Sequence, residues 1–142
     1  MQTQGSKNNT NGEKMIFKLN FGEDITQAIT EECRRKKIKS AYVFFIGAVQ
    51  KATIGYYNQK SKKYKKISIN KPMEIVSGVG NISLKNGESF LHAHVSLSDK
   101  NGKLSGGHLF SPTIVFACEV FILKNNKNLI RKFDKKTGLF LW

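Results

Sequence analysis

Residues 90–110 read FLHAHVSLSDKNGKLSGGHLF, a stretch that predicts a β-hairpin carrying every histidine of the chain. Over residues 90–97, apolar positions alternate strictly with other residues, as in a strand that buries one face. The expected buried face consists of Leu91, Ala93, Val95 and Leu97. On the other face His92 and His94 lie two positions apart, so their imidazoles project side by side.

The turn at Asp99–Gly102 decides where the third histidine lies. Asp at its first position and Gly at its last are typical of a three-residue loop closed by a G1 bulge. That loop pairs His94 with His108 and places all three imidazoles on one face. A two-residue Asn-Gly turn would instead place His108 on the far side, opposite Val95. The residue types favour the first register, and Gly106-Gly107 leaves space beside the imidazoles.

Three histidines on one face of a hairpin are a candidate metal site. Neutral imidazoles that converge from two adjacent strands suit Zn²⁺ or another divalent transition metal, with a fourth position left for water or a carboxylate. The same spacing is compatible with three strand histidines that bind nothing, so both interpretations stay open here. The candidate metal ligands are His92, His94 and His108.

The remaining sequence predicts an α+β fold, namely a mostly antiparallel sheet with one main helix packed on it. The helix is expected over Glu23–Ile38, where apolar residues recur at helical spacing and Asp24 can cap the start. Residues 1–14 are polar without periodicity and predict a flexible tail, which leaves 15–142 as the domain. Besides the hairpin strands 89–97 and 103–110, the expected strands are 15–19, 41–48, 52–57, 64–69, 73–79, 113–123 and 129–133.

Length and composition narrow the class of protein. A chain of 142 residues usually forms one domain with an adequate core. The longest nearly apolar run, Ala41–Val49, is far shorter than the roughly 18 residues of a membrane span. Cys33 and Cys118 lie far apart without a C-x-x-C motif, so neither a disulfide framework nor a zinc–thiolate site is expected. We therefore expect a reduced, cytoplasmic protein.

The net charge of +14 predicts a weak, salt-dependent attraction to polyanions such as DNA. Only three of the 24 basic residues are Arg, so little sequence-specific base recognition is expected. Lys60–Lys66 has the pattern of an exposed hairpin tip followed by a sheet edge. Arg34–Lys37 is more typical of a solvated helix end than of a binding patch.

The sequence resembles the plants-and-prokaryotes-conserved (PPC) domain, and more closely its single-domain prokaryotic members. The resemblance runs from about Met15 to the C-terminus and rests chiefly on Leu91-His92-Ala93-His94 followed by Gly106-Gly107-His108-Leu109. It implies α+β subunits assembled as a homotrimer, with a metal at the three histidines. Prokaryotic members are often described as DNA-binding proteins. Plant relatives add Arg-Gly-Arg-Pro hooks, which this sequence lacks.

Three functions are compatible with these features. The first is a small DNA-associated or regulatory protein with a metal site. The second is a metal-dependent, hydrolytic enzyme acting on a small molecule, since a three-histidine zinc site can lower the pKa of bound water to about 7. Its candidate general base is Glu119, an acid in an apolar strand that could equally be a strand carboxylate paired with a lysine. The third is a structural metal that joins two strands. A substrate-sized pocket beside the histidines would favour the enzyme, whereas a continuous basic face would favour DNA.

Overall fold

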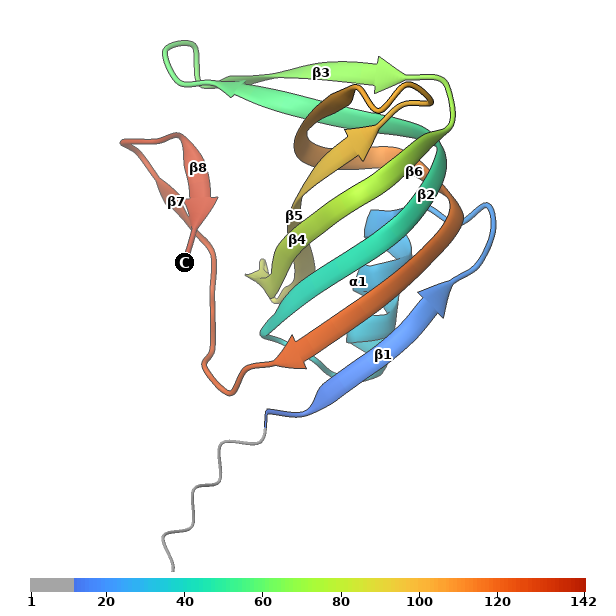
Figure 1. Cartoon of the computed structure of the whole chain (residues 1–142). Helices are drawn as coiled ribbons and strands as arrows, with labels where there is room; N and C mark the ends of the chain where they lie inside the picture. Colours follow the sequence, from blue (N-terminus) through green and yellow to red (C-terminus); the bar gives the residue numbers. More distant parts are fainter. Residues whose placement is uncertain (1–11) are drawn as a thin grey trace, which may run out of the picture.

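The computed structural model describes residues 12–142, so nearly all of the predicted tail lies outside the described residues. These residues form one main sheet, one helix and a small C-terminal hairpin (Figure 1). In chain order the elements are β1 (Lys14–Leu19), α1 (Ile25–Arg35), β2 (Ala41–Asn58), β3 (Lys63–Ile69), β4 (Met73–Lys85), β5 (Glu88–Ser98), β6 (Leu104–Lys124), β7 (Lys132–Asp134) and β8 (Leu139–Leu141).

Four long antiparallel strands of the main sheet close into a ring. β2 pairs with β4, β4 with β5 and β5 with β6, and β6 returns to pair with β2. β1 and β3 extend this ring along β6 and β2 respectively (Figure 1). Because side chains alternate across each strand, every second residue points inward and forms the core. The predicted buried face of residues 90–97 is confirmed, since Leu91, Ala93, Val95 and Leu97 are all buried.

The predicted α+β class is wrong, because the described residues are 64% strand and only 8% helix. β2 and β6 run through 18 and 21 residues, where the sequence predicts two separate strands each. Register shifts around Val49 and Lys51 absorb the irregularities as bulges instead of ending the strands. The helix is also shorter than predicted, because Lys37 adopts a left-handed φ of 54° just beyond its end.

α1 packs on β5 and β6 and buries Ile25, Ile29 and Cys33. The predicted cap is confirmed, since Asp24 Oδ1 accepts a hydrogen bond from the Gln27 backbone N–H at 3.0 Å. The same carboxylate accepts hydrogen bonds from Ser111 Oγ and the Thr113 N–H, both at 2.8 Å, and so fastens the helix to β6. No helix in the described part of the chain is long and apolar enough to cross a membrane.

The C-terminal residues form a hairpin, β7–β8, that stands apart from α1 (Figure 1). The sequence predicts only one strand here, over 129–133, and β8 is not predicted. Residues 129–131 run beside β4, because Leu84 exchanges backbone hydrogen bonds with Leu129 and Arg131, both at 2.8 Å. Tyr57 Oη also donates to the Thr137 carbonyl at 2.8 Å. The hairpin is therefore held beside the end of the ring that carries the histidines.

Candidate metal centre

The turn between β5 and β6 has the geometry that its residue types favour. The Asp99 N–H donates to the Lys103 carbonyl at 3.0 Å, and Gly102 takes a left-handed φ of 76°. His94 is consequently paired with His108. The predicted register is confirmed, and the alternative that would place His108 on the far face does not occur.

The structure brings the three histidines together. The Nε2 atoms of His92 and His94 lie 3.2 Å apart. One ring nitrogen from each of the two, together with one from His108, forms a group whose members all lie within 4.8 Å of one another. His92 and His108 are half-buried, whereas His94 is exposed. The cluster thus has one side open to incoming ligands.

A close approach of two backbones helps to position His108. A Cβ atom on Gly107 would lie only 2.6 Å from the Gly55 carbonyl oxygen in β2. Only glycine permits this approach, since real Cβ contacts below 3.0 Å are essentially never seen. The space predicted from Gly106-Gly107 is therefore used for backbone packing directly beside His108.

The surroundings of the cluster favour neutral imidazoles. Burial lowers the pKa of His92 to about 4, with further contributions from the positive charge of Arg131 and from His94. Burial also lowers the pKa of His108 to about 4, helped by the neighbouring His92 and His94 and by Arg131. A neutral ring has a free lone pair, which is the form that binds a metal.

Two further side chains contact the outer nitrogens of the cluster. Tyr64 Oη lies 3.4 Å from His108 Nδ1, and Arg131 Nη2 lies 3.5 Å from His92 Nδ1. With these Nδ1 atoms turned outward, the Nε2 atoms of both rings are left for the interior of the cluster. Sequence reasoning missed both residues. For Arg131, the sequence offers two signals. Arg is rare in this Lys-rich chain, and Arg131 directly follows the apolar pair Leu129-Ile130.

Two cavities meet the cluster. We call the first, of about 480 Å³, the Trp142 cavity; it is lined by Ala41, Tyr42, Val79, Gly80, Asn81, His92, His94, Asn125, Lys127, Leu129 and Trp142. We call the second, of about 390 Å³, the Arg131 cavity; it is lined by Tyr57, Lys62, Tyr64, Lys85, Phe90, His92, His108, Phe110, Arg131, Gly138, Leu139, Phe140 and Leu141. Both volumes lie in the range of small-molecule sites.

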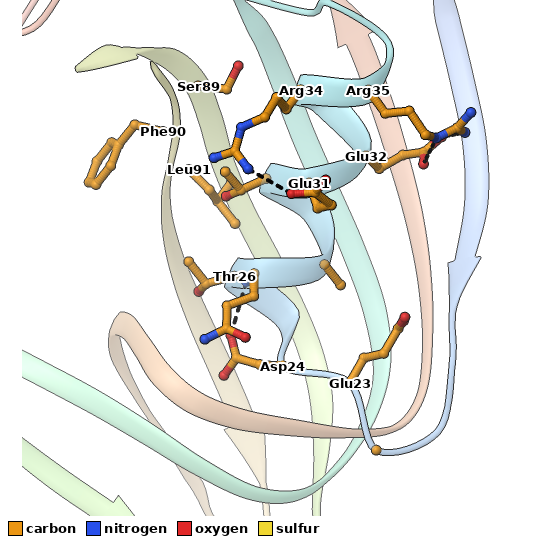
Figure 2. A pocket seen from close by; sticks show the side chains of 14 residues that line it. Glu23, Asp24, Thr26, Glu31, Glu32, Arg34, Arg35, Ser89, Phe90 and Leu91 are labelled. Carbon is orange, nitrogen blue, oxygen red and sulfur yellow. Dashed lines mark hydrogen bonds and ion pairs between the residues drawn. The ribbon is translucent and has the colours of Figure 1, made fainter. Parts of the chain in front are cut away.

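A larger groove, of about 940 Å³, follows the outer side of α1 and does not reach the histidines (Figure 2). Both of its arginines are paired with carboxylates. Arg34 contacts Glu31 at 2.7 Å and Glu88 at 3.2 Å, and Arg35 contacts Glu32. These pairs agree with the interpretation of Arg34–Lys37 as a solvated helix end.

Glu119 is not brought to the histidines within one chain. It lies exposed on β6, between Lys18 of β1 and Ile46 of β2, and it lines neither cavity.

Comparison with known proteins agrees with the motif and the fold. The model of the Plants and Prokaryotes Conserved (PCC) domain, the PPC domain named above, matches residues 6–126. The chain belongs to the PPC domain family. None of the curated proteins is similar enough in sequence to count as a match. The part of this PPC protein beyond residue 126, which includes Arg131 and the C-terminal hairpin, lies outside the match.

Solved structures of other PPC-like chains are similar over nearly the whole length. A metal-containing protein from Archaeoglobus fulgidus is 45% identical, with a TM-score of 0.88 over 92% of this chain and 93% of its own. A PPC protein from Pyrococcus horikoshii is 37% identical, with a TM-score of 0.87 over 92% and 91%. A "putative DNA-binding protein" from Bacteroides thetaiotaomicron is 29% identical, with a TM-score of 0.86 over 92% and 91%.

Proposed function

We propose that this PPC protein binds a divalent transition metal, zinc by preference, through His92, His94 and His108. The observation that carries the proposal is the 3.2 Å separation of the His92 and His94 Nε2 atoms. Two nitrogens about 2.05 Å from a tetrahedral zinc ion lie about 3.3 Å apart, so the two rings already have the spacing of one edge of a coordination tetrahedron. The metal-containing relative from A. fulgidus supports the same assignment.

The outer contact of His108 fits the same proposal. A histidine that binds a metal through Nε2 carries its proton on Nδ1 and usually donates it to a neighbouring acceptor. Tyr64 Oη, 3.4 Å from His108 Nδ1, can accept that proton. Tyr64 would thereby orient the ring of His108 toward the other two histidines.

The metal would act on a small molecule instead of only joining two strands. A zinc ion held by three imidazoles supplies a Lewis acid with an open coordination position. Two cavities of about 480 and 390 Å³ lead to the cluster, which a metal that merely joins two strands would not need. Metal-dependent chemistry on a small molecule is therefore the function that the geometry supports best. Glu119 stays a candidate base only if an assembled oligomer brings it near a second chain's histidines.

Elemental analysis of protein purified without chelators tests the metal site directly. We expect about one zinc ion per chain in the unaltered protein and loss of the metal in His94→Ala, because two ligands seldom hold zinc tightly. Ser96→Ala is the matched control, since Ser96 lies on the same face of β5, two residues from His94. Absence of any transition metal from the unaltered protein, even after incubation with zinc, would refute the site.

A homotrimer is the proposed assembly. Ile16, Phe121, Phe44 and Val79 form one continuous cross-strand row over β1, β6, β2 and β4, and each is at least 44% exposed. Monomers rarely expose a contiguous apolar strip of this kind, so a second copy of the chain is its expected partner. The number three comes from the family resemblance. Because Val79 pairs with His94, the interface would lie beside the metal centre.

Light scattering tests the assembly. Phe44→Asp places a carboxylate in the middle of the row, and we expect it to give monomers where the unaltered protein gives trimers. Phe133→Asp is the control, because Phe133 is an even more exposed phenylalanine on β7, away from the row. A monomeric unaltered protein at micromolar concentration would contradict the proposal.

DNA binding is a second candidate function. The favouring observations are the net charge, the exposed lysines of the β2–β3 hairpin over Lys60–Lys66, and a relative described as a "putative DNA-binding protein". Fluorescence anisotropy with duplex oligonucleotides should show affinity that falls steeply with salt and hardly depends on sequence. Changing Lys63 and Lys65 to Gln should make the salt dependence shallower by about one per lost phosphate contact. No binding at low salt would remove this candidate.

A further inference from the structure

Arg131 carries a buried positive charge that no carboxylate balances. Arg131 is only 8% exposed, yet none of the chain's ten acidic residues, all of which lie in the described part, forms an ion pair with it. Burying an unpaired charge is expensive, so such groups usually face a partner. The partner of this guanidinium is therefore expected to come from outside the chain.

Neutral groups hold the guanidinium in a fixed position. Nε donates to Ser83 Oγ at 2.6 Å, Nη1 to the Phe140 carbonyl at 2.9 Å and Nη2 to Asn81 Oδ1 at 2.8 Å. Of the five N–H groups of an arginine, this leaves one on Nη1 and one on Nη2 without a short hydrogen bond. A planar donor fixed in this way is suited to a carboxylate or a phosphate.

The metal centre adds a second unsatisfied donor at the same place. When His92 binds a metal through Nε2, its Nδ1 carries a proton and becomes a donor. That Nδ1 faces Arg131 Nη2 at 3.5 Å, so two donors point at each other. An oxygen with a negative charge that lies to one side of both nitrogens, about 2.8 Å from each, would accept from both.

The Arg131 cavity has room for a small anion, and its lining adds further positive charge and apolar surface. Lys62 and Lys85 line it together with Arg131, and no acidic residue does. Its walls are largely aromatic, and Lys85 Nζ lies 4.9 and 4.5 Å from the ring centres of Phe90 and Phe140. The cavity thus combines a charged floor beside the histidines with apolar walls that suit the body of a small molecule.

We propose that the Arg131 cavity binds a small organic oxyanion, a carboxylate or a phosphate on an apolar body, whose oxygens bridge Arg131 and His92. This inference rests in part on the proposed metal function, since the metal fixes the proton on His92. It assigns the substrate class of the centre as anionic. It also gives the C-terminal hairpin a role, because Phe140 and Leu141 close one side of the cavity.

Isothermal titration calorimetry with benzoate and phenyl phosphate tests the proposal at constant, near-physiological ionic strength. Both metal-free and zinc-loaded protein are titrated, and benzamide serves as the neutral analogue. We expect at least one anion to bind and benzamide not to bind, with the stronger of the two anions showing whether carboxylate or phosphate is preferred. In the zinc-loaded protein, the anion should also shift the Nδ1 resonance of His92 in a histidine ¹⁵N spectrum.

Three variants separate this site from general attraction to a basic surface. Arg131→Gln should weaken anion binding about tenfold or more, as expected for the loss of a charge-assisted hydrogen bond. Lys85→Met should weaken it about threefold, because Lys85 is only half-buried and water screens its charge. Lys103→Met, which removes an equal charge at the distant β5–β6 turn, should leave the affinity unchanged. If Arg131→Gln fails to fold, the double variant Lys62→Met/Lys85→Met tests the proposal in its place. An unchanged anion affinity in the double variant overturns the proposal.

The outcomes distinguish this inference from the metal proposal. Binding that needs Arg131 in a protein that takes up no zinc supports the anion site and refutes the metal centre. Zinc uptake without anion binding keeps the metal centre and overturns the anion site. Equal binding of benzamide and benzoate, or equal affinity of Arg131→Gln and the unaltered protein, also overturns it.

Discussion

Gly107→Ala should damage the metal centre as well as the fold, since Gly107 adopts a φ of 157°, a conformation that L side chains rarely adopt. The added Cβ would lie 2.6 Å from the Gly55 carbonyl oxygen, and it needs at least 3.0 Å, so β6 must move by at least 3.0 − 2.6 = 0.4 Å. Metal–ligand distances vary by only about 0.2 Å, so the displaced neighbour, His108, would no longer complete the site. We expect the zinc affinity to fall about tenfold or more.

Gly102→Ala is the matched control, because it strains the backbone of the same hairpin without a steric clash. Gly102 has nothing within 4 Å of its Cβ position but adopts a φ of 76°, so alanine there costs roughly 1 kcal/mol of folding stability. Its zinc affinity should not change. Competition with a chromogenic chelator measures the affinity, and urea denaturation of the metal-free proteins measures the stability. An unchanged zinc affinity in Gly107→Ala would refute the link between backbone approach and ligand position.

Three further predictions concern pH and stability. Burial lowers the pKa of His92 and His108 from 6.5 to about 4, so between these pH values the unfolded chain binds more protons than the folded chain. The metal-free protein should therefore lose stability as the pH falls from 6.5 toward 4, which urea denaturation measures. Asp24→Ala removes the cap of α1 and both hydrogen bonds to β6 and should cost about 2 kcal/mol, whereas Glu31→Ala on the exposed side should cost about 0.5 kcal/mol or less in the same assay. Leu97→Ala, at a fully buried position, should lower the free energy of unfolding by about 2–5 kcal/mol.

The histidine hairpin was predictable because its determinants are local. Strict alternation over residues 90–97 fixes which side chains share a face, since a strand allows no other period. Asp99 and Gly102 fix the turn, and the turn fixes the register that pairs His94 with His108.

The fold class was mispredicted because strand length is not a local property. The sequence marks interruptions near Lys51 and Pro112, and both strands nevertheless continue through them. Pairing with β3, β4 and β6 stabilises β2 as one long strand, and bulges absorb the mismatch. The helix, fixed between Asp24 and Lys37, then makes up only a small share of the chain.

The sequence by itself determined the three-histidine cluster, the cap of the helix and the family, because each depends on residues close together in the chain. Only the tertiary structure decided what surrounds the cluster. Arg131 lies 39 residues after His92 and reaches it because residues 129–131 run beside β4, while Tyr64 arrives from a different strand pair. Glu119 lies in the same closed sheet but lines neither cavity beside the histidines. Neighbours of this kind are set by how the strands close into a ring, and no pattern of adjacent residues encodes that closure.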